Sequence, residues 1–275
     1  VELVPVGPQS YYINSPAKIG IYERSREDVY LIDSGNDKDA GRRVRKILDE
    51  RGWRLKGIVN THSNADHIGG NQYLQKQFGC DIFSSGMEAA FTRYPILEPS
   101  FLYGGYPFRE LRHKFLLAAE SDVKEVTDEA FPEELEIIPL PGHFFDMIGI
   151  RTPDDTVFLA DCVSSPATLE KYKVTFIYDV ARYLETLTML EALQAGMFVP
   201  AHTEATNDLV PLIEANRKAV LDIADVLLSL CREPSCFETI LQGIFARYGL
   251  NMSAEQYVLV GSTIRSYLAW LRDED

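Results

Sequence analysis

The first eighty residues alternate short apolar runs with turn-forming or charged residues. The runs Tyr11–Ile13 and Ile19–Tyr22 are divided by Asn14-Ser15-Pro16, which predicts antiparallel strands. The segment 38–51 carries its apolar side chains on one side and is followed by Gly52, as expected of an amphipathic helix. The elements predicted here are strands at 11–13, 19–22, 29–33 and 55–59 and helices at 38–51 and 71–78.

Beyond residue 80, strand patterns give way to helix patterns. The turn Thr152-Pro153-Asp154-Asp155 joins two apolar runs into a predicted hairpin. Strands followed by helices, twice over, suit an α+β fold with two packed sheets and helices outside. The predicted elements are strands at 80–84, 123–131, 135–140, 148–150, 157–159 and 197–199, a helical turn at 86–92, and helices at 180–195 and 209–230.

The last seventy residues show only helical patterns. An apolar stripe runs along residues 209–230. Two capping boxes, Ser235-x-x-Glu238 and Ser253-x-x-Gln256, predict helices that extend to about Tyr248 and Leu271. We therefore predict a domain at 1–207 that carries both sheets and a C-terminal helical module at 208–275.

Residues 93–122 lack a regular pattern. Pro95 to Phe108 holds three prolines and two adjacent glycines, which predicts a long loop over the mouth of a site. The alternative, which we favour slightly, is an inserted loop that packs its own aromatics on the scaffold. His113 has no motif around it and is expected at the surface. The aromatic residues that could border a pocket are Tyr94, Phe101, Tyr103 and Tyr106.

Composition narrows the range of partners. The 275 residues are 46% hydrophobic and carry a net charge of −14, so the surface repels phosphate backbones and anionic membranes. The four cysteines form no CxxC pair, and no apolar run reaches membrane-spanning length. We expect free thiols, a cytoplasmic protein and no membrane or nucleic-acid partner.

Candidate chemistry is concentrated between a predicted strand and a predicted helix, at residues 60–70. Two of only five histidines lie there, His62 and His67, with Asp66 beside them. Imidazole and carboxylate are the ligands that zinc or iron prefers. Gly69 and Gly70 permit positive φ and close backbone approach, so the loop can fold tightly around an ion.

This segment, Thr61-His62-x-Asn64-x-Asp66-His67-x-Gly69-Gly70, resembles the signature of the metallo-β-lactamase-fold hydrolases, His-x-His-x-Asp-His-x-Gly-Gly. Three later segments also resemble motifs of that family, in the same order. They are Pro141-Gly142-His143, Phe158-Leu159-Ala160-Asp161 and Pro200-Ala201-His202. The departure is Asn64, which stands where the family has its second histidine.

The resemblance implies a four-layer αβ/βα sandwich with two metal sites. Asp66, His67 and His202 would form one, with Asp161 bridging. The other would comprise His62, His143 and position 64. An asparagine amide is a poor zinc ligand beside imidazole, so this second site is expected to be weak, or to hold manganese or iron. The alternative is that the amide oxygen binds and both sites fill. We expect one or two zinc ions.

Two further residues have more than one interpretation. In the resembled family an aspartate at the place of Asp33 supports the metal loop from behind, but Asp33 could instead cap the turn before the next helix. Tyr178 is a candidate proton donor to a leaving group, and a packed tyrosine at a helix start is the alternative that we favour. Asp179 is predicted to cap that helix.

Metal-assisted hydrolysis is the implied activity, with Asp66 orienting the attacking water. We expect a small thioester, ester or lactone as substrate, as in the glyoxalase-II-like members. The first alternative is a phosphodiesterase or endoribonuclease-like hydrolase, because the tail is similar to a winged-helix-like tail of one branch of the superfamily. The second is a metal- or ligand-binding module weakened by Asn64. The tail itself is acidic, so we expect it to pack, line a pocket or form a homodimer contact.

Overall fold

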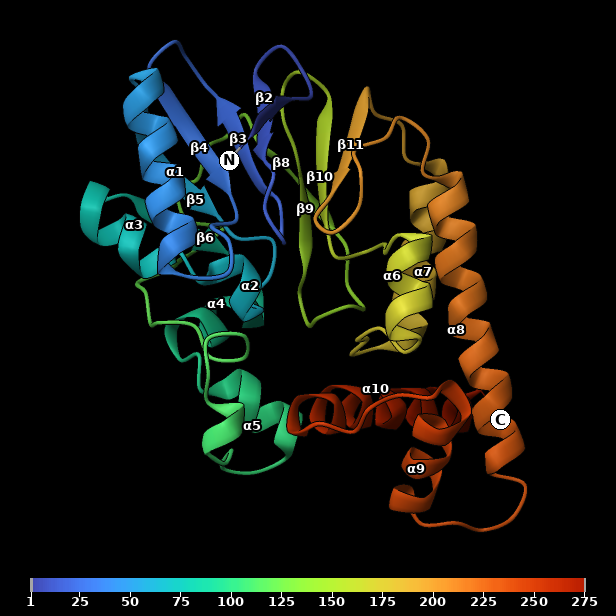
Figure 1. The fold of residues 1–275 in the computed structure, drawn as a ribbon. Helices are drawn as coiled ribbons and strands as arrows, with labels where there is room; N and C mark the ends of the chain where they lie inside the picture. Colours follow the sequence, from blue (N-terminus) through green and yellow to red (C-terminus); the bar gives the residue numbers. More distant parts are fainter. Residues whose placement is uncertain (1, 275) are drawn as a thin grey trace.

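Two β-sheets face each other at the centre of the molecule, and helices cover the outer face of each (Figure 1). The computed structural model describes residues 2–274. The first sheet contains, in spatial order, β1 (Leu3–Pro5), β2 (Ser10–Ile13), β3 (Ile19–Glu23), β4 (Asp28–Ile32), β5 (Arg54–Val59), β6 (Asp81–Ser84) and β7 (Lys124–Glu125). The second contains β11 (Met197–Pro200), β10 (Thr156–Ala160), β9 (Ile148–Arg151) and β8 (Glu136–Pro139).

The type of strand pairing changes once within each sheet, from antiparallel to parallel. The strands β1 to β4 pair antiparallel, and β4 to β7 pair parallel. In the second sheet β8, β9 and β10 pair antiparallel, and β11 runs parallel to β10. The helices are α1 (Lys38–Arg51), α2 (Ala65–Ile68), α3 (Asn71–Phe78), α4 (Gly86–Arg93), α5 (Leu97–Tyr103), α6 (Pro166–Tyr172), α7 (Val180–Ala192), α8 (Val210–Leu230), α9 (Phe237–Tyr248) and α10 (Ala254–Asp273).

Alternate residues of the central strands enter different apolar layers. In β4, Leu31 packs beneath α1 and α3, whereas Tyr30 and Ile32 face the second sheet. In β10, Phe158 faces the first sheet and its neighbour Leu159 packs against the outer helices. A strand buried on both faces reads as a continuous apolar run, which explains why these strands were visible in the sequence. The expected four-layer α+β sandwich is confirmed.

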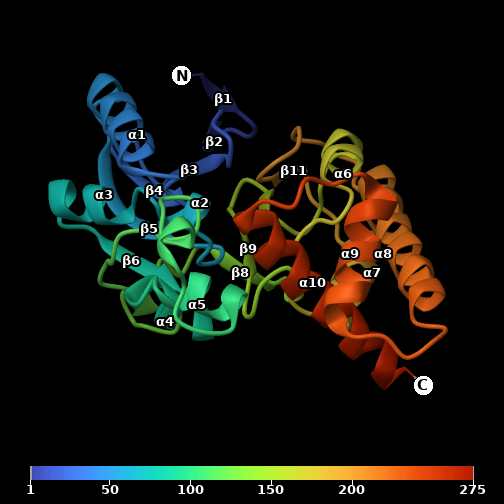
Figure 2. The same cartoon turned by 60° about the horizontal axis from the view of Figure 1, so that its bottom comes forward.

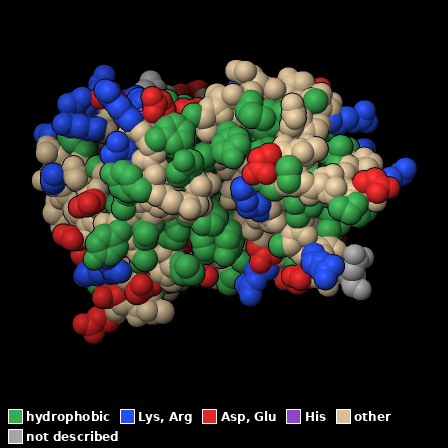
Figure 3. Space-filling view, turned by 90° about the horizontal axis from the view of Figure 1, so that it is seen from below, with side chains coloured by type: hydrophobic (Ala, Val, Ile, Leu, Met, Phe, Trp, Pro, Cys, Tyr) green, Lys and Arg blue, Asp and Glu red, His purple; other side chains and the backbone are tan. Residues whose placement is uncertain are grey.

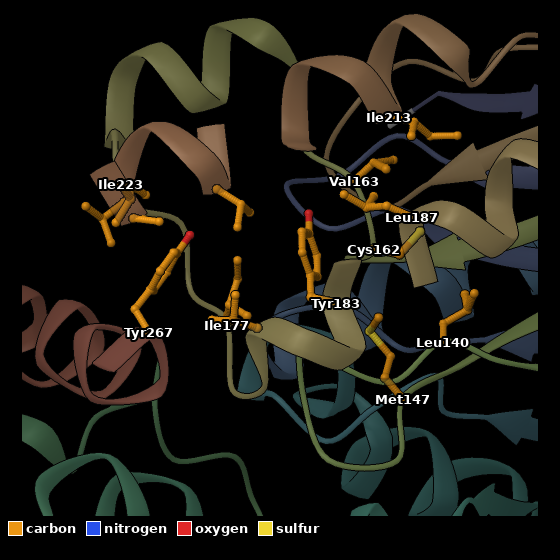
Figure 4. Packing of buried hydrophobic residues seen from close by; sticks show 14 of the residues in the cluster. Leu140, Met147, Cys162, Val163, Ile177, Tyr183, Leu187, Ile213, Ile223 and Tyr267 are labelled. Carbon is orange, nitrogen blue, oxygen red and sulfur yellow. The ribbon is translucent and has the colours of Figure 1, made fainter. Parts of the chain in front are cut away.

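The C-terminal helices extend the core of the second half. Buried residues of α7, α8 and α10 form one cluster with the second sheet, and Tyr183, Ile223 and Tyr267 all belong to it (Figure 4). Residues 208–274 contain three helices and no strand, so the helical character is confirmed and the winged-helix-like character is not. The domain boundary at 207/208 stays a prediction.

The segment 93–122 is not simply a loop. It contains α5, which lies beside α10 (Figure 2), and a short 3₁₀ turn at Arg109–Leu111. Pro99 is tolerated because it occupies the first helical turn, where the backbone N–H has no intrahelical partner, and Gly104 ends the helix with φ +78°. Figure 3 shows hydrophobic side chains gathered on the face of the molecule seen from below. Tyr94 and Tyr106 of this segment are exposed.

Three other local predictions differ from the structure. Only Lys124–Glu125 pairs with β6, because the backbone then turns at Asp128, so the long strand at 123–131 is wrong. The helix α6 was not predicted. The Ser235 capping box is wrong as well, since the Ser235 hydroxyl donates to the carbonyl of Glu233, whereas Ser253 caps α10 through the N–H of Gln256.

Close backbone packing holds the 60–70 loop. A Cβ on Gly70 would lie 2.4 Å from the carbonyl oxygen of Ser34, and one on Gly69 would lie 2.4 Å from the backbone of Asn36. Both glycines have negative φ, so of the two properties that glycine permits the loop uses close backbone approach. None of the helices between residues 2 and 274 combines the length and apolarity that a membrane span requires.

Glu88 of α4 also fixes the 60–70 loop, through hydrogen bonds. Its buried carboxylate accepts hydrogen bonds from the N–H and hydroxyl of Ser63 and from the N–H of Asp146, which joins two loops of opposite sheets. Burial raises the pKa of Glu88 to about 7, although these hydrogen bonds act in the opposite direction.

The pKa of Glu88 predicts a pH-dependent contribution to stability. Between pH ~4.5 and ~7 the unfolded state has lost this proton while the folded state keeps it, so stability falls as pH rises through that window. In chelator-treated protein, the wild type should lose roughly 3 kcal/mol of unfolding free energy relative to Glu88→Gln across the window. Urea unfolding at several pH values measures this difference. The exposed Glu185→Gln is the control, and parallel curves for wild type and Glu88→Gln would contradict the prediction.

Candidate metal centre

Four histidines and two aspartates meet at one end of the two sheets. His62 follows β5, and Asp66 and His67 lie on α2, so the first sheet supplies three of the six. The second sheet supplies the others from the loops after β8, β10 and β11. Ligand-type atoms of His62, His143 and Asp161 lie within 4.8 Å of one another, and those of Asp66, His67 and His202 form a second such group.

Three of the four imidazoles are fixed through Nδ1. The Nδ1–H of His67 donates to Asp33 Oδ2 at 2.8 Å, that of His143 to the Phe176 carbonyl at 3.1 Å, and that of His202 to the Pro16 carbonyl at 2.8 Å. A carbonyl or carboxylate can only accept, so Nδ1 carries the proton in all three rings. Their Nε2 atoms therefore present lone pairs to the cluster when the rings are neutral, which is the tautomer that binds a metal.

Asp161 lies between the two groups. Its Oδ1 is 3.2 Å from Nε2 of His67, and its Oδ2 is 3.2 Å from Nε2 of His202. The same Oδ2 lies 3.6 Å from Nε2 of His143, which belongs to the other group. One carboxylate thus contacts both groups, the arrangement needed for a bridging ligand.

Several of the cluster's polar atoms lack hydrogen-bond partners. Nε2 of His62, Nε2 of His67 and Oδ1 of Asp161 are buried and accept or donate no hydrogen bond within residues 2–274. Buried polar atoms without partners are rare and costly. Nitrogen and carboxylate oxygen atoms that converge in this way match the donor set of a zinc site, so the residues fit a divalent cation.

The charges of the cluster also favour a cation. Asp161 raises the pKa of His202 to about 10, and this effect outweighs the opposing effect of burial. Burial disfavours a charged His67 too, but the carboxylates of Asp161, Asp66 and Asp33 raise its pKa well above the usual range. Burial instead lowers the pKa of His62. Three nearby carboxylates thus stabilise positive charge here, whether it is carried by a proton or by a metal ion.

Asn64 lies at the edge of the first group. Its Oδ1 is 3.2 Å from Nε2 of His143, and its amide nitrogen donates to Oε1 of Glu98 at 2.9 Å. Glu98 is buried on α5, and burial raises the pKa of its carboxyl group. Because Oε1 of Glu98 accepts in this contact, the NH₂ group of Asn64 points outward and its oxygen points toward the cluster.

Asp33 supports the cluster rather than the turn. Its buried carboxylate accepts hydrogen bonds from the N–H and hydroxyl of Thr61 as well as from His67, and its φ is +64°. The cap of α1 is Asp37, which accepts from the N–H of Ala40. The turn-cap alternative for Asp33 is therefore not what the structure shows.

Tyr178 packs against aromatic rings. It stacks on Phe145 with ring centroids 3.9 Å apart and meets Phe101 edge to face. Asp179 caps α7 through the N–H of Arg182, as predicted. The fifth histidine, His113, lies outside the cluster, where its Nε2 is 2.7 Å from a carboxylate oxygen of Glu255.

Three supporting residues were not predicted from the sequence: Thr61, Glu88 and Glu98. The two glutamates are buried acids on short helices, and a buried acid is normally paired. Their positions on the buried sides of α4 and α5 were the only available signal, and α5 itself was not predicted.

A comparison with known families matches the chain to the metallo-beta-lactamase superfamily over residues 16–202. Similar curated proteins include hydroxyacylglutathione hydrolases. That of Cereibacter sphaeroides is 30% identical over 114 residues, which cover 42% of this chain and 36% of the relative. That of Brucella ovis is 28% identical over 137 residues, which cover 46% and 44%. The chain thus spans less than half the length of these relatives.

Solved structures share the fold over nearly the whole chain. A metallo-beta-lactamase family protein from Thermus thermophilus has a TM-score of 0.74 at 17% identity, covering 98% of this chain and 95% of that one. A beta-lactamase domain protein from Burkholderia ambifaria has a TM-score of 0.70 at 16% identity, covering 99% and 89%. These likenesses show the fold, and the family match over residues 16–202 establishes that the chain belongs to the metallo-beta-lactamase superfamily.

Proposed function

We propose that this protein is a metal-dependent hydrolase of small thioesters, esters or lactones. One observation carries the proposal: ligand atoms from both sheets converge in two groups, and three of these atoms are buried without a hydrogen-bond partner among the residues that the structure describes. The family match and the relatives named hydroxyacylglutathione hydrolase support hydrolysis, and the latter act on a thioester.

Zinc suits the group formed by Asp66, His67 and His202, with Asp161 as the bridging ligand. The group that contains His62 and His143 is completed by the amide oxygen of Asn64, a neutral and weak ligand, so it should hold zinc less tightly or prefer manganese or iron. When bound, the cation lowers the pKa of a coordinated water from ~15.7 toward ~7 and polarises the scissile carbonyl.

The chain's own residues would orient the attacking water. Asp66 is the more accessible acid of the cluster, with 34% of its side chain exposed against 14% for Asp161. Its Oδ2 lies 3.3 Å from Nε2 of His202 and can accept a hydrogen bond from that water. Tyr178 takes no part in this proposal, because its ring is stacked on Phe145.

Two other functions remain as outcomes of the tests below. Phosphodiester or RNA hydrolysis has little support, since residues 233–275 contain three arginines against six acids. A binding module without turnover would follow if Asn64 prevents the second site from filling.

Asp33→Asn should weaken the stronger metal site. The amide nitrogen would face Nδ1 of His67 in place of an acceptor oxygen and would favour the tautomer with hydrogen on Nε2, which cannot bind a metal. Zinc affinity should fall roughly 10- to 100-fold, as for other partners of metal-bound histidines. Competition with a chromophoric chelator measures it, and His113→Ala is the matched control. Unchanged affinity in Asp33→Asn would refute the orienting role of Asp33.

Asn64→His should strengthen the weaker site. Imidazole is a better zinc ligand than an amide oxygen, so the second zinc equivalent should bind at least about tenfold more tightly while the first is unchanged. A zinc titration combined with anomalous scattering assigns each equivalent to its site. Two equally tight zinc ions in the wild type would show that Asn64 does not weaken the site.

A four-substrate screen tests the activity. Zinc-loaded protein should hydrolyse a generic thioester or a lactone, and Asp161→Ala should lower that rate by at least about 100-fold through loss of the bridging carboxylate. Bis-p-nitrophenyl phosphate and single-stranded RNA should be poor substrates. Preferential cleavage of either would favour the phosphodiesterase alternative. No turnover of any substrate, in the wild type or in Asn64→His, would favour the binding module.

A further inference from the structure

A cavity of about 600 Å³ adjoins the metal centre, and His143, Asp161 and His202 form part of its wall. The volume is within the range of pockets that enclose small molecules. A larger hollow of about 710 Å³ lies between α5 and α10, but none of the candidate metal ligands lines it. A molecule bound in the smaller cavity would therefore meet the metal centre.

Two helices from different parts of the chain enclose this cavity. The helix α6 contributes Ala167 and Thr168, and α10 contributes Gln256, Leu259 and Val260. The spacing of the last three puts them on one face of α10. The C-terminal helix thus supplies a wall next to the metal centre, so it is placed to influence which substrates fit.

Most of the lining is apolar. Val163, Val174 and Phe176 line the cavity together with Leu259 and Val260, so a bound group would exchange water for hydrocarbon contacts. Such a surface favours an alkyl chain over a polar peptide. Burying each methylene group raises affinity by about fourfold.

Among the described residues that line the cavity, Lys171 is the one charged residue apart from those of the metal centre. Its Nζ lies 3.0 Å from the hydroxyl of Tyr172 and 4.5 Å from the centre of that ring, and it forms no ion pair with any acid in residues 2–274. Its neighbour Lys173, by contrast, pairs with Glu170 at 2.5 Å. In a chain with a net charge of −14, an unpaired cation beside an apolar cavity is available to an anionic ligand.

We propose that the cavity binds the acyl chain of the substrate and that Lys171 pairs with a single carboxylate at the far end of that chain. The substrate class is then a thioester or ester of a dicarboxylic acid, esterified at one end. Glutathione carries two carboxylates and an ammonium group, which an apolar cavity with one free cation does not match. This inference rests on the proposed hydrolase function.

The reaction balances without a further reactant. Water adds to the carbonyl carbon, and the C–S or C–O bond breaks. The thiol or alcohol leaves with one proton, and the acyl chain leaves as a dicarboxylate with release of the second proton.

Three thioesters of N-acetylcysteamine test the proposal, because they differ only in the acyl group: acetyl, hexanoyl and 5-carboxypentanoyl. With zinc-loaded wild type, kcat/KM should rise at least about tenfold from acetyl to hexanoyl. It should be highest for the carboxylate-terminated chain. Lys171→Met should lower kcat/KM for that substrate about tenfold and leave hexanoyl unchanged. Lys173→Met is the matched control, and Lys171→Arg should restore most of the loss.

A second variant tests the apolar wall. Ala167 is exposed on α6 and lines the cavity, so Ala167→Phe should fill space there without disturbing the core. Hydrolysis of the hexanoyl thioester should fall about tenfold while that of the acetyl thioester is retained. Equal kcat/KM for all three acyl groups, or no effect of Lys171→Met, would overturn the substrate assignment while leaving the hydrolase function standing.

A binding measurement separates this inference from the proposed function. The amide analogue of the 5-carboxypentanoyl thioester, with NH in place of sulfur, is titrated calorimetrically into chelator-treated protein. Binding that Lys171→Met weakens about tenfold supports the cavity assignment even if no thioester is turned over, in which case the proposed function alone fails. Absence of binding to the wild type, or binding indifferent to Lys171, would overturn the assignment.

Discussion

The structure depends on how the imidazole rings at the ends of the two sheets are held. In His67, His143 and His202, Nδ1 donates to a fixed acceptor: the Asp33 carboxylate and the backbone carbonyls of Phe176 and Pro16. Each hydrogen bond leaves Nε2 directed at the same small space. Asp161 lies in that space, within 3.6 Å of all three Nε2 atoms. The site is thus preorganised by partners outside it, which a metal ion does not have to rearrange.

A layer of buried acids makes this arrangement rigid. Asp33 accepts hydrogen bonds from Thr61 and His67. Glu88 accepts hydrogen bonds from Ser63, and Glu98 accepts one from Asn64. Buried carboxylates are costly unless they receive hydrogen bonds, so each constrains the 60–70 loop to conformations that supply donors. Glu88 also bonds to Asp146, from the loop between β8 and β9. The site therefore forms only when both sheets are packed together.

The sequence predicted the parts that depend on local pattern. Strands buried on both faces gave continuous apolar runs, Gly52 ended α1, and six ligand-type residues followed predicted strands. The features that the sequence did not predict depend on tertiary contacts. Glu98 reaches Asn64 across 34 positions, and α5 forms despite Pro99 because that residue lies in its first turn. The sequence left two roles open for Asp33, and the structure gives the cap of α1 to Asp37 while Asp33 contacts His67. The wall supplied by α10 likewise joins segments that no spacing rule connects.

We propose that inward-facing Nε2 atoms and Asp161 hold a cation. A crystal structure of the protein grown with zinc, with anomalous data collected at the zinc absorption edge, tests this proposal. We expect an anomalous peak among Asp66, His67 and His202, about 2.0–2.1 Å from Nε2 of each histidine, with an oxygen of Asp161 in the same shell. Zinc elsewhere on the molecule, or a cluster whose histidines turn Nδ1 inward, would contradict it.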